Sequence, residues 1–171
     1  MIRIAGIADD SIVDGPGIRV TLFCQGCPHH CPGCQNQETW PFSGGTEIEE
    51  EALFARIREN PLARGVTFSG GEPFAQAAGF AKLASMLRQA GYEIACYTGY
   101  LFEELLCGTP EQQSLLRELD VLIDGPFVEK LKSLSIPYRG STNQRILDVP
   151  ASLREGKAIE QKAARWQGEY E

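Results

Sequence analysis

The feature that most constrains the fold of this chain is an alternation of strand-like and helix-like segments. The expected strands, short runs of mainly apolar residues, cover residues 18–23, 65–68, 92–98, 121–124 and 144–149. Segments with a helical spacing of apolar residues lie between most of them. Because a helix between two strands returns the chain to the same end of the sheet, such strands pair in parallel. The sequence therefore predicts an α/β fold.

Three longer helices are expected, each with a recognisable start. Thr46 and Glu49 form a capping box before the first helix. Pro73 suits the first turn of the second helix, and Gly91 is its natural stop. Thr109 opens the third helix with a further capping box. These signals divide the chain into consecutive β/α units.

The length of the chain limits how many such units it holds. A complete barrel of eight units typically needs about 250 residues, whereas this chain has 171, which suits a single domain over residues 1–171. A short helix is expected within residues 128–134, and residues 151–171 form a polar tail that is helical or frayed. An incomplete β/α barrel and an open α/β sheet both fit, and spacing does not decide between them.

Composition excludes several classes of partner. The net charge of −7 makes binding along a nucleic-acid backbone unexpected. The N-terminal segment lacks the apolar core of a signal peptide, and no apolar run reaches membrane-spanning length. We therefore expect a cytoplasmic protein that binds neither nucleic acid nor membrane. In a reducing compartment, clustered cysteines indicate metal or redox chemistry rather than disulfides.

The cysteine cluster is the strongest chemical signal. Cys27, Cys31 and Cys34 follow the spacing C-x3-C-x2-C. Thiolates are the usual ligands of iron–sulfur clusters, and a four-iron cluster normally takes four of them. A site with three leaves one iron open to a substrate or cofactor. His29 and His30, the only histidines, lie in this loop and could tune a cluster by hydrogen bonding, which argues against a hydrolase triad elsewhere.

Cys24 raises the question of a fourth ligand. A zinc site would need two C-x2-C pairs that are usually further apart, and bacterial ferredoxins order their spacings differently. Alternation along the strand places Cys24 on its apolar face, where a free cysteine packs as a small hydrophobe. We expect three ligands, and a four-cysteine electron carrier is the non-enzymatic alternative. Cys96 and Cys107 lie in apolar segments and are expected in the core.

A second constellation, Ser69-Gly-Gly-Glu-Pro73, lies between a strand and a helix. In β/α folds, ligands gather at the carboxyl ends of strands. Gly70 and Gly71 let the backbone approach a ligand closely, and the helix start that follows suits an anionic group. Glu72 adds a carboxylate for an ammonium group. A zwitterionic amino acid presents both charges, although an isolated turn of this kind is more often an ordinary connection.

Four further polar residues are candidates for the same edge of the sheet. Thr98 and Asp124 end predicted strands on the ligand side and are expected to contact ribose or adenine. Arg139 and Arg145 could contact a cofactor or a partner, and a structural role is an equal alternative.

The cysteine spacing resembles the signature of the radical S-adenosylmethionine enzymes, and Gly70–Glu72 resembles the motif with which that family holds the methionine amino group. Other segments appear in the same order as in the activating proteins of anaerobic ribonucleotide reductases. These segments are residues 14–19, 35–40, 97–100, 121–127 and 139–145. The resemblance covers roughly residues 1–150.

This resemblance implies an incomplete β/α barrel and two cofactors. It implies a 4Fe–4S cluster held by Cys27, Cys31 and Cys34, with S-adenosyl-L-methionine on the fourth iron. The expected contacts to the cofactor are Gly33, Gly70, Gly71, Glu72, Thr98 and Asp124. No side chain is expected to act as an acid or a base.

The resemblance also implies a protein substrate. Reductive cleavage of S-adenosylmethionine would give a radical that takes a hydrogen from a glycine of the large subunit of the anaerobic ribonucleoside-triphosphate reductase. An electron donor such as flavodoxin is implied as a further partner. The alternatives are an activase of another glycyl-radical enzyme, such as pyruvate formate-lyase, and a small-molecule radical enzyme of the deazaguanine-forming type.

Overall fold

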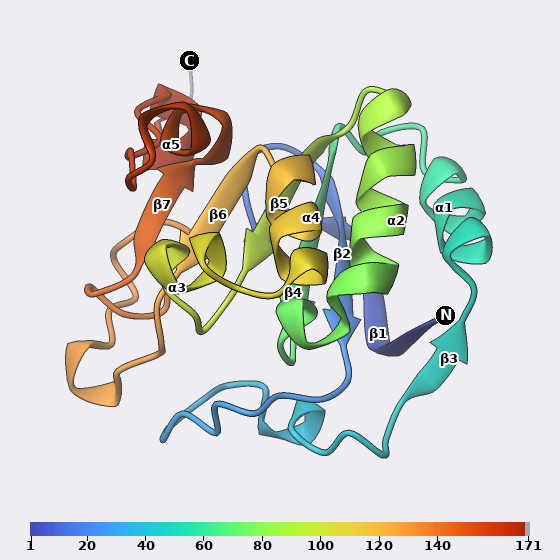
Figure 1. The fold of residues 1–171 in the computed structure, drawn as a ribbon, viewed down its shortest axis with the longest axis horizontal. Helices are drawn as coiled ribbons and strands as arrows, with labels where there is room; N and C mark the ends of the chain where they lie inside the picture. The colour runs from blue at the N-terminus through green and yellow to red at the C-terminus, as the bar shows by residue number, and fades with distance from the viewer. Residues whose placement is uncertain (170–171) are drawn as a thin grey trace.

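A computed structural model describes residues 1–169 and contains one seven-stranded sheet of order β3-β1-β2-β4-β5-β6-β7 (Figure 1). The strands are β1 (Ile2–Ser11), β2 (Arg19–Cys24), β3 (Thr46–Ile48), β4 (Gly65–Gly70), β5 (Glu93–Tyr97), β6 (Val121–Asp124) and β7 (Arg145–Asp148). The four central strands, β2, β4, β5 and β6, pair in parallel. The outer strands β1, β3 and β7 pair antiparallel.

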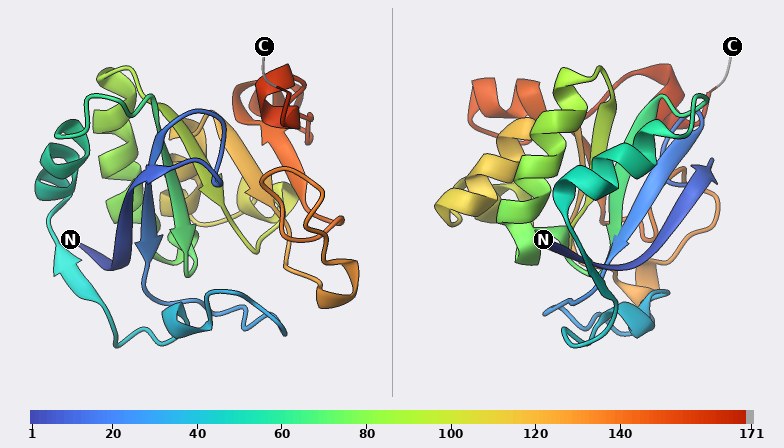
Figure 2. Two further views of the ribbon diagram at one scale, coloured as in Figure 1. Left: turned by 180° about the vertical axis from the view of Figure 1, so that it is seen from behind. Right: turned by 90° about the vertical axis from the view of Figure 1, so that its right-hand side faces the viewer.

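The helices lie mainly over one face of the sheet. The α-helices are α1 (Glu50–Arg58), α2 (Ala77–Gln89), α3 (Phe102–Leu106), α4 (Pro110–Glu118) and α5 (Val149–Glu155). The 3-10 turns are η1 (Gln37–Thr39), η2 (Pro73–Gln76), η3 (Glu129–Leu131) and η4 (Ala164–Gln167). Helices α1, α2 and α4 cover the same face, as the side view shows (Figure 2, right). Helix α2 buries Phe80 against Phe68 of β4, with ring centroids 4.7 Å apart.

The expected α/β class is confirmed, and the sheet is not closed. It has two edge strands, β3 and β7, and an incomplete barrel is not established by this topology. The helical crossovers between β2, β4, β5 and β6 bring the carboxyl ends of these strands to one edge. The loops that leave that edge begin at Gln25, Gly71, Thr98 and Gly125. This edge is where the architecture can position a ligand.

Two local predictions are wrong near the N-terminus of α1. Thr46 belongs to strand β3 and pairs with Ile4 of β1, so it does not cap a helix. Glu49 is the N-cap residue, and its side chain makes no capping hydrogen bond. Strand β1 was not predicted at all. The capping box at Thr109 is confirmed, because its hydroxyl accepts from the Gln112 N–H at 3.2 Å.

The expected helix within residues 128–134 is only the short turn η3. Leu134 is 89% exposed, so the apolar spacing there does not form a buried helix face. Helix α3, a single short stretch after β5, was not predicted.

The segment after Pro150 packs against the sheet. Helix α5 is followed by η4, whose Trp166 is fully buried. The guanidinium of buried Arg19 lies 5.4 Å from the centre of the Trp166 ring, and Arg165 pairs with Glu93, which also pairs with Arg19. This network ties the C-terminal segment to β2 and β5. Within the part of the chain that the structure describes, we find no helix of the length and apolarity needed to span a bilayer.

Candidate cofactor site

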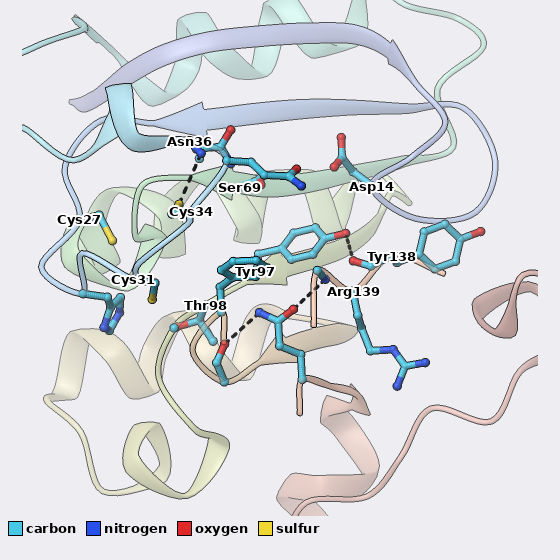
Figure 3. A pocket seen from close by; sticks show the side chains of 18 of the residues that line it. Asp14, Cys27, Cys31, Cys34, Asn36, Ser69, Tyr97, Thr98, Tyr138 and Arg139 are labelled. Carbon is cyan, nitrogen blue, oxygen red and sulfur yellow. Dashed lines mark hydrogen bonds between the residues drawn. The ribbon is translucent and has the colours of Figure 1, made fainter. Parts of the chain in front are cut away.

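A cavity of about 610 Å³ opens at the carboxyl ends of the parallel strands. Its wall includes the thiols of Cys27, Cys31 and Cys34, which lie together at one end of the cavity (Figure 3). Tyr138 and Arg139 lie toward the other end. Ser69, Tyr97 and Thr98, from the ends of β4 and β5, lie between the two. The architecture therefore brings the predicted cysteine loop to the predicted edge of the sheet.

Backbone hydrogen bonds close the cysteine loop at its base. The N–H of Gly26 donates to the carbonyl of Thr39 at 2.6 Å, and that of Cys27 donates to Trp40 at 3.1 Å. Between these points, the Asn36 N–H donates to the Cys34 sulfur at 3.4 Å. Hydrogen bonds to sulfur are one means by which proteins tune a cluster. The loop therefore presents its thiols from a closed base.

The three thiols fit a multi-iron cluster better than a single ion. Four Zn–S bonds of about 2.3 Å place tetrahedral sulfurs only about 3.8 Å apart. Among residues 1–169, the sole group of at least three Cys, His, Asp or Glu ligand atoms that all lie within 4.8 Å of one another is Glu49, Glu50 and Glu51. The three cysteine sulfurs therefore do not all lie within 4.8 Å of one another, which is wider than the spacing around one zinc ion, and three thiolates of this kind suit an iron–sulfur cluster.

Cys24 lies in the core, as predicted. Its side chain is fully buried, and burial raises the pKa of the thiol well above its ordinary value, with the Glu72 carboxylate adding to the rise. Cys96 is also buried, as predicted. Cys107 is exposed, so the prediction that it lies in the core is wrong. Cys107 is the first residue after α3, which ends at Leu106, and its side chain lies outside the core.

The glycine turn after β4 packs against the chain itself. A Cβ on Gly71 would overlap the carbonyl oxygen of Gly26 and lie 2.9 Å from that of Cys24. The Gly71 N–H donates to the Cys24 carbonyl, and the Glu72 N–H donates to that of Gly26, both at 2.8 Å. Gly70 has a φ of +83°. Both glycines also line the cavity, so the turn joins the base of the cysteine loop to the cavity wall.

The Glu72 carboxylate is buried, only 1% exposed, and it accepts hydrogen bonds from the protein. Its Oε1 accepts from the Thr98 hydroxyl and the Gly99 N–H, both at 2.8 Å, and lies 2.7 Å from the His29 Nε2. Its Oε2 accepts from the Phe74 N–H at 3.0 Å. Glu72 is not among the residues that line the cavity. In this arrangement its carboxylate binds loop and strand ends rather than projecting toward a ligand.

Of the remaining residues predicted to contact a cofactor or a partner, some line the cavity and others do not. Thr98 lines the cavity, and so does Arg139, whereas Asp124, Arg145 and Gly33 do not. Asp124 is fully buried and pairs with Arg145, whose Nη2 lies 2.5 Å from Oδ2. Gly33 has a φ of +77°, and a Cβ there would lie 2.7 Å from the side chain of Glu129.

Replacing Arg145 by methionine is expected to lower the free energy of unfolding by about 3 kcal/mol, because it leaves the Asp124 carboxylate buried without its cation. Urea unfolding at neutral pH measures this change. The matched control is Arg154→Met in α5, since Arg154 is exposed and a surface substitution usually changes stability by less than about 0.5 kcal/mol. Equal effects of the two variants would contradict the structural role of the Asp124–Arg145 pair.

The cavity wall also includes residues that were not predicted as site residues, and Asp14, Tyr97 and Tyr138 are among them. Asp14 accepts from the hydroxyls of Ser11 at 2.6 Å and Thr21 at 3.0 Å. The Tyr97 hydroxyl donates to the Tyr138 carbonyl at 2.5 Å, and burial raises the pKa of Tyr97. Tyr97 stands directly before Thr98 at the end of β5, so the strand-end rule that selected Thr98 could also have selected it. No local sequence signal indicates that Tyr138 would line the same cavity.

The chain matches a family of iron–sulfur proteins. Residues 13–147 match the family model described as the 4Fe-4S single cluster domain. This match agrees with three thiols on a cavity wall.

Similar proteins of known name indicate a more specific family. A protein of Vibrio cholerae named anaerobic ribonucleoside-triphosphate reductase-activating protein is 37% identical over 144 residues, which cover 79% of this chain and 90% of the relative. Proteins of the same name from Escherichia coli (strain K12) and Haemophilus influenzae are 38% and 35% identical and are each covered to 90%. The chain therefore belongs to the family of anaerobic ribonucleoside-triphosphate reductase-activating proteins, as the sequence segments predicted.

Among solved structures, the chain is similar to QueE from Escherichia coli, with a TM-score of 0.45 and 22% identity. The superposition covers 57% of this chain and 52% of that one, which is too partial to define a shared fold.

Proposed function

We propose that this protein activates an anaerobic ribonucleoside-triphosphate reductase by radical S-adenosylmethionine chemistry. The observation that carries the proposal is the placement of Cys27, Cys31 and Cys34 on one wall of a cavity at the carboxyl ends of parallel strands. Family membership supports the same conclusion, since the relatives bear the name of that activating protein. We also propose that the open sheet corresponds to an incomplete β/α barrel.

A 4Fe–4S cluster on the three thiolates would supply one electron that breaks the S–C5′ bond of S-adenosylmethionine, giving methionine and a 5′-deoxyadenosyl radical that takes a hydrogen atom from a glycine Cα of the reductase. The protein's own residues would bind the cluster and S-adenosylmethionine and enclose them. Cys27, Cys31 and Cys34 would each hold one iron of the cluster, and Gly70 and Gly71 line the same cavity. The cavity volume of about 610 Å³ lies within the range typical of cofactor sites.

The aromatic side chains of the wall limit the access of water. Trp40, Tyr97, Phe127 and Tyr138 all line the cavity. Exclusion of water protects reactive intermediates from side reactions. Since the cofactors carry the chemistry, the protein supplies binding and orientation. We also propose that Thr98, which lines the cavity, contacts the cofactor, and that an external carrier such as flavodoxin provides the electron in the cytoplasm.

Anaerobic reconstitution tests the proposal. The protein is loaded with iron and sulfide, reduced with dithionite and given S-adenosylmethionine, and we expect 5′-deoxyadenosine by chromatography. With the large reductase subunit present, we expect a glycyl-radical signal in electron paramagnetic resonance. Absence of 5′-deoxyadenosine would refute the radical mechanism. A signal with pyruvate formate-lyase but not with the reductase would identify a different partner, and turnover of a small molecule without any protein would identify a different class.

Exposed apolar side chains around the cavity support a macromolecular substrate. Ile12 is 66% exposed, Val13 is 70% exposed and Leu134 is 89% exposed, and all three line the cavity. Apolar side chains that stay exposed together at a site mark surfaces of interaction. A protein substrate that presents a glycine would cover them.

The variant Leu134→Asp is expected to lower glycyl-radical formation on the reductase about tenfold, equivalent to the loss of about 1.4 kcal/mol of docking energy. Its effect on 5′-deoxyadenosine formation without the partner should be much smaller. Initial rates of both reactions measure the difference. Leu62→Asp is the control, because Leu62 is 61% exposed and lies outside the cavity wall. An equal loss in both reactions would exclude a docking role for Leu134.

A further inference from the structure

The geometry points to His29 as a positioning residue that clamps the cysteine loop onto the ends of β4 and β5 through the Glu72 carboxylate. His29 lies between the first two cysteines of the loop. This inference rests on the proposed function, because the loop is taken to hold the cluster. It assigns Glu72 to the placement of the loop, in place of the ammonium contact expected from sequence.

The hydrogen bond at the centre of the clamp is short and shielded. The His29 Nε2 lies 2.7 Å from the Glu72 Oε1, and the two side chains are 18% and 1% exposed. Since Glu72 already accepts from two backbone N–H groups and the Thr98 hydroxyl, its carboxylate acts as the acceptor throughout. A carboxylate has only acceptor atoms, so Nε2 carries the hydrogen in this contact.

Two further contacts fix the His29 ring. The ring meets Tyr100 edge-on, with centroids 4.5 Å apart and an interplanar angle of 77°. On another side it packs against Gly99, where a Cβ would lie 2.5 Å from the His29 Cδ2. The glycine at position 99 therefore leaves the space that the ring occupies. The segment that follows β5 therefore packs against the His29 ring on two sides, while Glu72, in the turn after β4, makes its hydrogen bond.

The clamp joins the segments that follow three neighbouring strands. His29 belongs to the loop after β2, Glu72 to the turn after β4, and Gly99 to the turn after β5. The backbone bonds of Gly26 and Cys27 close the base of the cysteine loop on the loop itself. His29 instead ties the part between Cys27 and Cys31 to the cavity wall. Hydrogen bonds to a carboxylate are shorter and stronger than those between neutral groups, and such a bond in a shielded place can hold a short loop in one position.

The adjacent histidine provides an internal comparison. His30 stacks on Trp40 of the same loop, with centroids 4.7 Å apart and planes 5° from parallel. Its ring contact therefore lies within the loop and makes no link to β4 or β5. If the clamp is specific, the same substitution at positions 29 and 30 should have different consequences.

Three variants test the clamp in the whole protein. His29→Phe keeps a ring against Gly99 and Tyr100 but removes the N–H donor. His29→Gln restores an N–H near the position of Nε2. His30→Phe is the matched control. Hydrogen exchange of peptides within residues 26–36 is measured without the cluster, and exchange in α2 reports global stability. After reconstitution, the dissociation constant of S-adenosylmethionine is measured from the change it causes in the cluster's electron paramagnetic resonance spectrum.

We expect His29→Phe to speed exchange in the loop about tenfold and to weaken S-adenosylmethionine binding about tenfold, equivalent to about 1.4 kcal/mol, with α2 unchanged. His29→Gln should recover most of both losses, and His30→Phe should keep the loop's protection. Wild-type exchange in His29→Phe would overturn the clamp, and so would failure of His29→Gln to recover either loss. The exchange result does not need radical chemistry, so it decides the clamp even if the wild-type protein forms no 5′-deoxyadenosine.

Discussion

Cys31→Ala is expected to leave the protein without a stable 4Fe–4S cluster, whereas Cys24→Ala is expected to keep it. Cys31 lines the cavity and is partly exposed, as a ligand must be to reach an iron. Cys24 is fully buried on β2, and burial holds its thiol protonated by raising its pKa. A cluster deprived of one of three protein ligands lacks the support that cubanes normally have.

Iron and sulfide analysis after anaerobic reconstitution, with the visible absorption spectrum, measures this prediction. The wild-type protein and Cys24→Ala should bind about four irons per chain, and Cys31→Ala only a small fraction of that. Removing one buried sulfur should cost Cys24→Ala about 1 kcal/mol of stability, too little to unfold it. Cys107→Ala, at an exposed thiol, is the control for handling losses. Loss of the cluster in Cys24→Ala would support a four-ligand electron carrier instead.

The centre of the sheet was predictable because its signals are local. Strands β2, β4, β5 and β6 are runs of apolar residues between turn signals, and burial on both faces makes such runs nearly continuous. In β6, all four residues of Val121–Asp124 are buried. Helices α2 and α4 were predicted by the spacing of their apolar residues, and Thr109 marks the start of α4. Pro73, predicted in the first turn of α2, instead begins the 3-10 turn η2, and α2 starts at Ala77.

The edge of the sheet was not predictable in the same way. Strand β3 exists because Thr46 and Ile48 pair with Ile4 and Ile2 of β1, more than forty residues earlier. A local reading sees Thr46 and Glu49 as a capping box, and long-range pairing overrides it. The alternation of apolar and polar residues in the chain's first ten residues stops after Ile4, so it is too short to mark the whole of β1 as a strand.

In the candidate site, too, the features set by local signals were predictable and the long-range contacts were not. The three cysteines and the turn at Gly70–Gly71 were placed correctly at one edge, because strand ends gather there in any parallel sheet. The residues that pair with the buried carboxylates could not be predicted from the sequence. Glu72 meets His29 across 43 residues of sequence, and Asp124 meets Arg145 across 21. No local pattern selects such partners, so the protein contacts of both carboxylates were not predicted.

Gly71→Ala is expected to combine a large loss of stability with loss of the cluster. The added methyl group would overlap the Gly26 carbonyl oxygen, and backbone cannot move aside as a flexible side chain can. The two hydrogen bonds from residues 71 and 72 to Cys24 and Gly26 would have to lengthen or break. Overpacking of about 1–3 kcal/mol and about 1 kcal/mol for each of the two weakened bonds together give about 3–5 kcal/mol.

The loss of the cluster follows from what those bonds hold. Gly26 directly precedes Cys27, so a shift of its carbonyl moves the first ligand relative to the turn that hydrogen-bonds to the base of the loop. Urea unfolding and iron content after reconstitution measure the two effects. Gly6→Ala in β1 is the matched control, because no heavy atom lies within 4 Å of a Cβ built there, and it should change neither quantity appreciably. Full iron content in a destabilised Gly71→Ala protein would show that the turn supports the fold without positioning the cysteine loop.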